Sequence, residues 1–193
     1  MVAVLERPPL KARKGREYTA DEVLELNDDH IWELVDGQLV EKHVANHAAQ
    51  TASEMWLRLR TYGSEHGGVA IPPEGFVRLM QSARQLKRPD TGFIVHGRLS
   101  GDVLDDGYLD IPVDLIVEVI SPRDIAELVE QKLRAYQASG VRLIWAIYPK
   151  ARSIRVLSLN GGDRRIFEGD VLTGEDVLPG FSVPVSEVLP PFK

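Results

Sequence analysis

The segment Val113–Pro122, with the sequence VDLIVEVISP, constrains the fold more than any other part of the chain. It is short, rich in β-branched residues and closed by a Ser-Pro pair, which predicts a β-strand. Its apolar residues fall on both faces, as is typical of a strand in the middle of a sheet. Glu118 lies at its centre. Because burying an ionised carboxylate is costly, Glu118 is predicted to face a metal, a cation or several hydrogen-bond donors.

The helix expected next, over residues 124–139, contains a misfit of opposite charge. Its apolar side chains recur at helical spacing, and they are Ile125, Leu128, Val129, Leu133 and Tyr136. The angular centre of that stripe falls near position 132, which is a lysine. Glu118 and Lys132 could satisfy each other and could both face a reacting group. The alternative is a buried ion pair whose lysine extends along its own stem to solvent.

The strand pattern on either side of this helix predicts a parallel pair. Strand 113–120, helix 124–139 and strand 141–148 have the layout of a βαβ crossover. Strand 153–159 alternates, so we expect it at the edge of the sheet. Its apolar residues then suggest a homodimer, although a covering C-terminal segment, 161–193, explains them equally well; these residues are Ile154, Val156 and Leu157.

Three elements are predicted upstream. Thr19, with Glu22 three residues later, can cap a short helix. Residues 31–35 and 38–41 form a hairpin, because Asp36-Gly37 between them is typical of a type I′ turn. A long helix follows over about 46–66, with Asn46 as its N-cap.

Two further acids could join Glu118. Alternation places Glu33 on the face of its strand that carries Ile31 and Val35, so it is either a buried carboxylate or an exposed strand residue. Pro89 can only start or border a strand, which places Asp90 at the beginning of one. A side chain at that position can point into a cleft.

Composition bounds the class of protein. The chain has 193 residues, 44% of them hydrophobic, and no apolar run of membrane-spanning length, so we expect one cytoplasmic globular domain over 18–193 after a flexible tail, 1–17. Without cysteine, any metal must be held by oxygen or imidazole, which favours magnesium or manganese over structural zinc. A net charge of −6 argues against a surface that binds nucleic acid everywhere.

Several segments together resemble the Uma-two (Uma2) family of restriction endonucleases, within the PD-(D/E)XK nuclease superfamily. The resemblance runs from about Tyr18 to Leu189 and depends on the order and spacing of separate motifs. The segments are Trp32–Gly37, Arg88–Asp90, Val117–Pro122, Lys132–Tyr136, and Gly140-Val141 followed by a strand that ends at Tyr148-Pro149.

The resemblance implies an α/β fold of mixed α+β type, with a restriction-endonuclease-like core in which helices flank a mixed β-sheet. By position in the motifs, Asp90 and Glu118 match the metal ligands, Lys132 matches a lysine on the following helix, and Glu33 matches an early glutamate. The superfamily's usual strand lysine is replaced here by Ile120, so Lys132 must supply the amine from the helix. Asp114 is another candidate ligand, although an exposed aspartate at the start of the strand is the favoured interpretation.

The predicted function is hydrolysis of DNA phosphodiester bonds with Mg²⁺ or Mn²⁺. Basic residues just upstream of Asp90 could position backbone phosphates without reading sequence, and these are Arg84, Lys87 and Arg88. One alternative is a catalytically silent module of the same fold that binds nucleic acid or a protein partner. Another is a metal-dependent hydrolase of a small phosphate ester. No membrane partner is expected.

Overall fold

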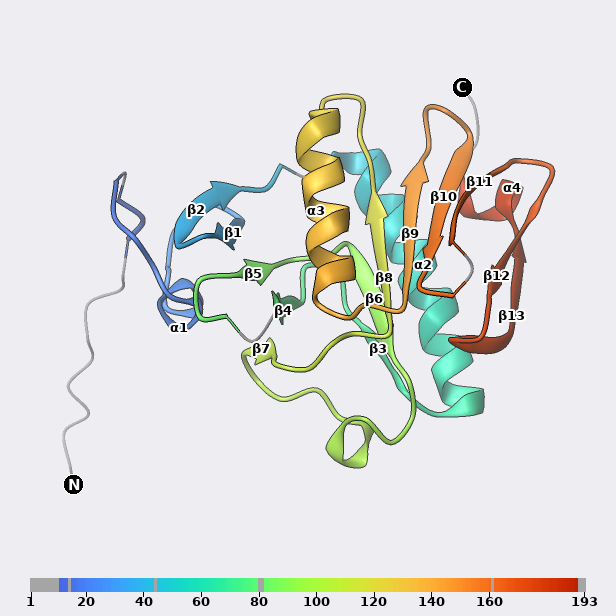
Figure 1. Cartoon of the computed structure of the whole chain (residues 1–193), viewed down its shortest axis with the longest axis horizontal. Coiled ribbons are helices and arrows are strands. Elements are labelled where there is room, and N and C mark those ends of the chain that lie inside the picture. The colour runs from blue at the N-terminus through green and yellow to red at the C-terminus, as the bar shows by residue number, and fades with distance from the viewer. Residues whose placement is uncertain (1–10, 14, 44, 80–81, 161, 191–193) are drawn as a thin grey trace.

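A six-stranded mixed sheet forms the centre of the molecule (Figure 1). The computed structural model describes residues 11–13, 15–43, 45–79, 82–160 and 162–190. In spatial order, the strands are β11 (Gly162–Phe167), β10 (Ser153–Ser158), β9 (Leu143–Tyr148), β8 (Leu115–Val119), β6 (Thr91–Ile94) and β3 (Val69–Ile71). β8 and β9 are parallel, as the βαβ layout predicted, and their neighbours are antiparallel.

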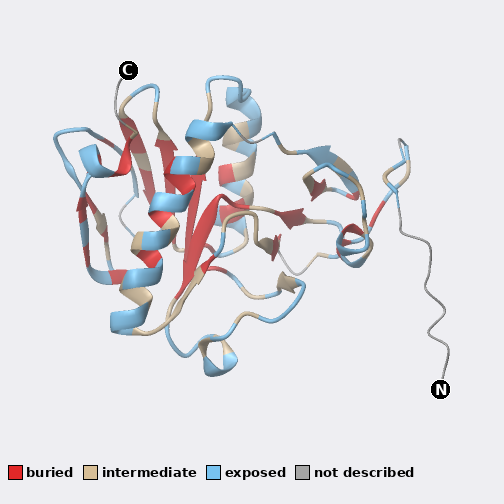
Figure 2. Ribbon diagram, turned by 180° about the vertical axis from the view of Figure 1, so that it is seen from behind, coloured by how far each residue is buried: buried red, intermediate tan, exposed pale blue. Residues whose placement is uncertain are grey.

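Helices cover both faces of this sheet, with α2 on one side and α3 on the other (Figure 1). The helices are α1 (Ala20–Leu24), α2 (Asn46–His66), α3 (Ala126–Ala138) and α4 (Val185–Val188), with a short 3-10 helix at Ser100–Asp102. Val117 of β8 belongs to the same core cluster as Met55 of α2, whereas Ile116 belongs to that of Leu133 of α3. The predicted mixed α+β fold with flanking helices is confirmed. The central strands are buried along almost all of their length (Figure 2).

A second, five-stranded sheet lies beside the first and carries the predicted hairpin. Its strands, in spatial order, are β2 (Gln38–Glu41), β1 (Trp32–Val35), β5 (Leu86–Lys87), β4 (Phe76–Arg78) and β7 (Tyr108–Leu109). Asp36 and Gly37 both have positive φ, 49° and 81°, as a type I′ turn requires. Leu34 and Leu86 join this sheet to α1 through a small core of their own.

The expectation that strand 153–158 is an edge strand is wrong. β10 pairs with β9 on one side and with β11 on the other, so β11 is the edge. Ile154 and Val156 are 0% exposed and pack in one cluster with residues of the C-terminal hairpin, β12 (Val171–Gly174) and β13 (Leu178–Pro184). Residues 162–190, the described part of the segment 161–193, therefore cover the apolar side chains of β10. This is the alternative to a homodimer that the sequence left open. The homodimer stays a prediction without this support.

The cap predicted for α1 is present in the structure, whereas the one predicted for α2 is not. Thr19 and Glu22 form the predicted capping box at α1. At α2, the prediction of Asn46 as N-cap is wrong: Asn46 is the first helical residue, and the cap is Ala45, which makes no side-chain hydrogen bond. Among the described residues, the first turn of α2 therefore has no side-chain cap for its amide groups.

Part of the predicted tail, residues 1–10 and 14, lies outside the described residues. In the part that is described, the backbone amide of Arg13 donates to the hydroxyl of Tyr18 at 2.6 Å. Within the described chain, no helix combines the length and the apolar character needed to cross a bilayer.

Candidate active site

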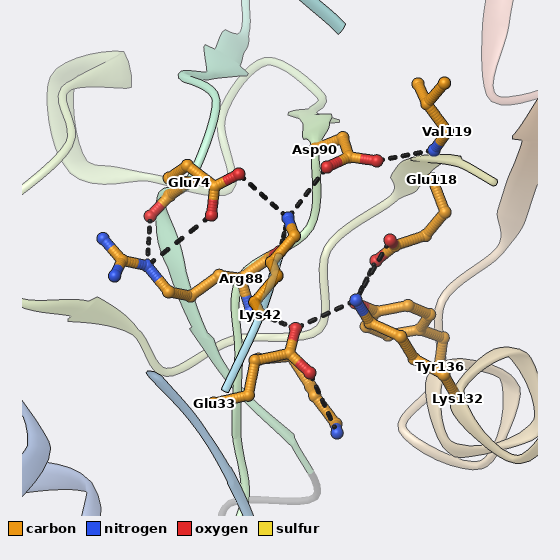
Figure 3. A network of polar contacts seen from close by, with 10 residues as sticks. Glu33, Lys42, Glu74, Arg88, Asp90, Glu118, Val119, Lys132 and Tyr136 are labelled. Atoms are coloured by element: carbon orange, nitrogen blue, oxygen red, sulfur yellow. Dashed lines mark hydrogen bonds and ion pairs between the residues drawn. The ribbon is translucent and has the colours of Figure 1, made fainter. Parts of the chain in front are cut away.

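A pocket of about 220 Å³ opens where α3 meets both sheets, and acids and lysines gather in it (Figure 3). Each of these side chains comes from a different element: β1, the segment after β2, the residue before β6, β8 and α3. The residues are, in that order, Glu33, Lys42, Asp90, Glu118 and Lys132. The fold thus brings together all four of the residues that the sequence nominated for catalysis, together with a second lysine.

Strand register places the two nominated metal ligands side by side. Thr91, the first residue of β6, pairs with Val117 in the antiparallel β6–β8 ladder. Continuing this register by one residue sets Asp90, just before β6, opposite Glu118. Both are buried, with 6% and 4% of their surface exposed. One carboxylate oxygen of Asp90 accepts the backbone N–H of Val119 at 2.5 Å. This bond fixes the orientation of the Asp90 carboxylate against the end of β8.

Glu118 is held by two side chains of α3. Lys132 Nζ lies 2.9 Å from Oε1 and 3.0 Å from Oε2, and the Tyr136 hydroxyl donates to Oε1 at 2.5 Å. Residues four apart share one face of a helix, which explains why both reach the same carboxylate. Burial would lower the pKa of Lys132, but the negative charges of Glu118, Glu33 and Asp90 outweigh it and raise the pKa. The Lys132 amine is therefore a fixed positive charge.

Whereas the pKa of a carboxyl in an exposed ion pair is lowered, the pKa of the Glu118 carboxyl is raised. Burial raises it, Asp90 and Glu33 add to the rise, and the positive charges of Lys132 and Lys42 oppose it. The ionised form of Glu118 is therefore destabilised, as expected for a carboxylate on a strand that is buried on both faces. A carboxylate kept at such a cost calls for a cation.

Glu33 is a buried carboxylate, which settles the alternative left open by strand alternation. It is 6% exposed, and its carboxylate faces Lys132 Nζ at 2.9 Å, Lys87 Nζ at 3.3 Å and the backbone amide of Arg88 at 3.1 Å. Burial would raise its pKa, but Lys132, Lys87 and these hydrogen bonds lower it to about 2.

Replacing Glu33 with glutamine is expected to cost about 3 kcal/mol of unfolding free energy at pH 7, given the pKa shift from 4.5 to about 2. A lowered carboxyl pKa stabilises the folded state above pH 4.5, and that stabilisation is lost as the pH falls toward 2. The difference between wild type and Glu33→Gln should therefore shrink between pH 4.5 and 2 in urea denaturation. The exposed Glu127→Gln is the control. A difference that does not change with pH would contradict this assignment.

Lys42 was not predicted from the sequence. Its amine lies 2.8 Å from Asp90 Oδ1 and 3.0 Å from Glu74 Oε1, and it donates to the carbonyl of Arg88 at 2.7 Å. Its pKa is raised, because Asp90, Glu118 and Glu74 outweigh the effect of burial. A signal was available: the two-residue turn pairs Glu33 with Val40, so Lys42, two residues on, shares their face.

The three residues nominated for phosphate binding are placed differently. Arg84 pairs with Glu17 and with the carbonyl of Asp36 at the hairpin turn, so the structure does not bring it to the pocket. Lys87 is 6% exposed, contacts Glu33 and does not line the pocket. Arg88 is half-buried; it donates to the carbonyl of Glu74 at 2.9 Å and lies over the Phe76 ring.

Asp114 is not the exposed residue that was expected. It is 1% exposed, and its carboxylate accepts from Arg98 at 2.7 Å, from Arg142 at 3.4 Å and from the backbone amide of Val95 at 3.0 Å. The residue is buried because two arginines and a backbone amide satisfy it. It does not line the pocket that contains Glu33, Asp90 and Glu118, which we call the acidic pocket.

The donor chemistry of the pocket suits a hard divalent cation. Asp90 and Glu118 offer adjacent carboxylate oxygens, and magnesium is commonly bound by one or two carboxylates together with water and substrate phosphates. Among the described residues, no three His, Cys, Asp or Glu side chains are arranged as a ready-made metal site. The reason is visible in Figure 3: the Lys42 amine lies between Asp90 and Glu74, and the Lys132 amine lies between Glu118 and Glu33. A cation that binds Asp90 Oδ1 would compete with Lys42 for that oxygen.

Comparison with known proteins gives a family and a fold. The model of the Uma2 family, described as "Putative restriction endonuclease", matches residues 18–186. Among solved structures, the chain is similar to the crystal structure of a putative nuclease belonging to DUF820 from Anabaena variabilis ATCC 29413, with a TM-score of 0.73. Sequence identity is 16%, and the match covers 88% of this chain and 96% of that one. No match was found among curated proteins.

Proposed function

Given that the chain belongs to the Uma2 restriction endonuclease family, we propose that it hydrolyses phosphodiester bonds of DNA with the help of a divalent metal ion, Mg²⁺ or Mn²⁺. One observation carries the proposal: two buried carboxylates, one just before β6 and one on β8, lie beside the partly buried Lys132 at the wall of an open pocket. Maintaining these charges away from water is costly, and perturbed groups of this kind cluster at functional sites.

Asp90 and Glu118 would hold the metal ion in this function. Such an ion lowers the pKa of water and neutralises charge that develops on phosphate oxygens. The protein's own part is orientation. The Val119 amide donates to Asp90 and the Tyr136 hydroxyl to Glu118, so each carboxylate has one contact that does not depend on the ammonium groups.

Lys132 provides the positive charge that the reaction requires. Its amine has hydrogen-bonding contacts to Glu118 and Glu33, and both lie within the pocket. From this position, the amine can donate a hydrogen bond to a phosphate oxygen or to the attacking water. A donor placed in advance where negative charge develops stabilises the transition state more than the ground state.

Supercoiled plasmid incubated with the purified protein provides the test. We expect conversion to nicked or linear DNA with Mg²⁺ or Mn²⁺, none in EDTA, and a loss of at least about 100-fold in rate for Asp90→Asn. Even changes to groups that only support a metal ligand typically cost about 10- to 100-fold. Equal cleavage by wild type and Asp90→Asn would show that a contaminant cuts the DNA, and the proposal would fail.

The pairing of each acid with an ammonium group favours one other function. Asp90 with Lys42 and Glu118 with Lys132 form complete ion pairs without any metal. A catalytically silent module that uses this network to hold its sheets together would look the same. Such a module binds DNA or a protein partner, takes up no divalent ion and cleaves nothing.

A further inference from the structure

A second hollow, of about 310 Å³, adjoins the acidic pocket. The two share one wall, made by the start of α2 and by the chain that leaves β8; the shared residues are Ala45, Ala48, Val119, Ile120 and Ser121. A third hollow continues beyond it and shares Ile120, Ser121, Pro122 and Lys150 with the second. These three adjoining hollows, which we call the groove, extend from the carboxylates across Ile120 to Lys150.

The two ends of this groove differ in charge. Acids outnumber the two lysines, Lys42 and Lys132, in the first pocket; the acids are Glu33, Glu41, Asp90, Glu118 and Asp124. The second hollow contains no acid among its lining residues, and its ionisable groups are His47, Lys150 and Arg152. Arg152 is already bound by Glu168. Lys150 is exposed and makes no ion pair within the part of the chain that the structure describes.

Apolar side chains and proline rings form most of the remaining wall of the second hollow. Ala48, Ile120 and Pro149 offer hydrocarbon surface, and Lys150 lines the same hollow. The β9–β10 turn holds the lysine there, since the amide of Ala151 donates to Tyr148 O at 3.1 Å and that of Arg152 to Pro149 O at 3.2 Å. An apolar face next to one free cation is complementary to a base or sugar carrying a phosphate.

We propose that the second hollow binds the nucleotide that adjoins the scissile phosphate, with its base and sugar against Ile120 and Pro149 and its outer phosphate on Lys150. This inference rests on the proposed function, because the acidic pocket defines which phosphate is cut. The volume, about 310 Å³, is at the lower end of the roughly 300–1,000 Å³ typical of small-molecule sites, which suits one nucleotide rather than several. The continuation past Lys150 gives the rest of the strand a path.

The test uses the intact protein in EDTA, so that no cleavage occurs. Thymidine 5′-monophosphate, thymidine and inorganic phosphate are titrated separately while backbone amide shifts are followed by NMR. We expect the monophosphate to shift amides of residues 45–48, 119–121 and 150–152 and to bind more tightly than either fragment. In Lys150→Glu its affinity should fall by about tenfold, the usual effect of losing one charged hydrogen bond. Lys11→Glu makes the same charge change in another hollow and should bind as wild type does.

Two results would overturn the subsite: shifts located elsewhere, or equal affinity in Lys150→Glu and wild type. Plasmid cleavage separates this failure from that of the proposed function. In the cleaving enzyme, Lys150→Glu should raise KM and leave kcat nearly unchanged. If nothing cleaves but the monophosphate still binds at Lys150, the nuclease proposal fails, and the hollow remains a nucleotide-binding site without a role in cleavage. If cleavage occurs and Lys150→Glu has the wild-type KM, the subsite fails and the nuclease stands.

Discussion

Lys132→Met is expected to lower the free energy of unfolding by about 3–5 kcal/mol, the typical cost of removing one partner of a buried ion pair. Methionine keeps most of the apolar stem of lysine but leaves the Glu118 carboxylate, 4% exposed, without its nearest cation. Glu33 keeps Lys87 and is affected less. Urea denaturation at pH 7 measures the change. Lys150→Met is the matched control, because an exposed lysine should contribute no more than about 0.5 kcal/mol.

The pairing itself is tested by a double variant. If Lys132 chiefly compensates Glu118, then Lys132→Met combined with Glu118→Gln should cost less than the sum of the two single changes, by about 0.5–3 kcal/mol. Additive effects, or a Lys132→Met variant as stable as Lys150→Met, would mean that the amine does not compensate the buried carboxylate.

Glu118→Gln should reduce metal-dependent plasmid cleavage by at least about 100-fold, for the reason given for Asp90. Its effect on stability should be smaller than that of Lys132→Met. Burial raises the pKa of Glu118, so the charged form is the disfavoured one, and a neutral amide of the same shape avoids that cost. Lys132 also keeps Glu33 as a partner, at 2.9 Å. Glu118→Gln should therefore lose most of its activity while keeping more of its stability than Lys132→Met does.

Single-turnover cleavage of plasmid, with circular dichroism to verify folding, measures this separation. Glu127→Gln makes the same chemical change on the exposed surface of α3 and should cleave at the wild-type rate. If Glu118→Gln cleaved as fast as Glu127→Gln, the Glu118 carboxylate would have no part in the reaction.

Much of the site could be predicted because misfits are visible in sequence. Glu118 in a two-sided apolar strand and Lys132 at the centre of a helical stripe each needed a partner, and the structure pairs them at 2.9 Å. Pairing across sheets is harder to predict. The hairpin register places Lys42 on the face of Glu33, but its contact with Asp90 also depends on how the hairpin packs, which no local pattern encodes.

Other expectations failed because they treated segments in isolation. The alternation of strand 153–159 was interpreted as an edge, but the next strand in the chain, β11, pairs with it and forms the edge instead. The helical stripe is not buried along its whole length: Ile125 and Leu128 are 62% and 53% exposed and line the acidic pocket. Arg84 precedes Asp90 by six positions, but it lies at the hairpin turn with Glu17.

Calorimetric titration of the metal-free protein with Mn²⁺ tests the central claim most directly, since the proposed nuclease must bind a divalent ion between Asp90 and Glu118. We expect saturable binding by wild type and by Asp106→Asn, an exposed aspartate away from the pocket, and loss of that binding in Asp90→Asn. Absence of Mn²⁺ uptake by the wild type, or undiminished uptake by Asp90→Asn, would contradict the account and favour the silent module.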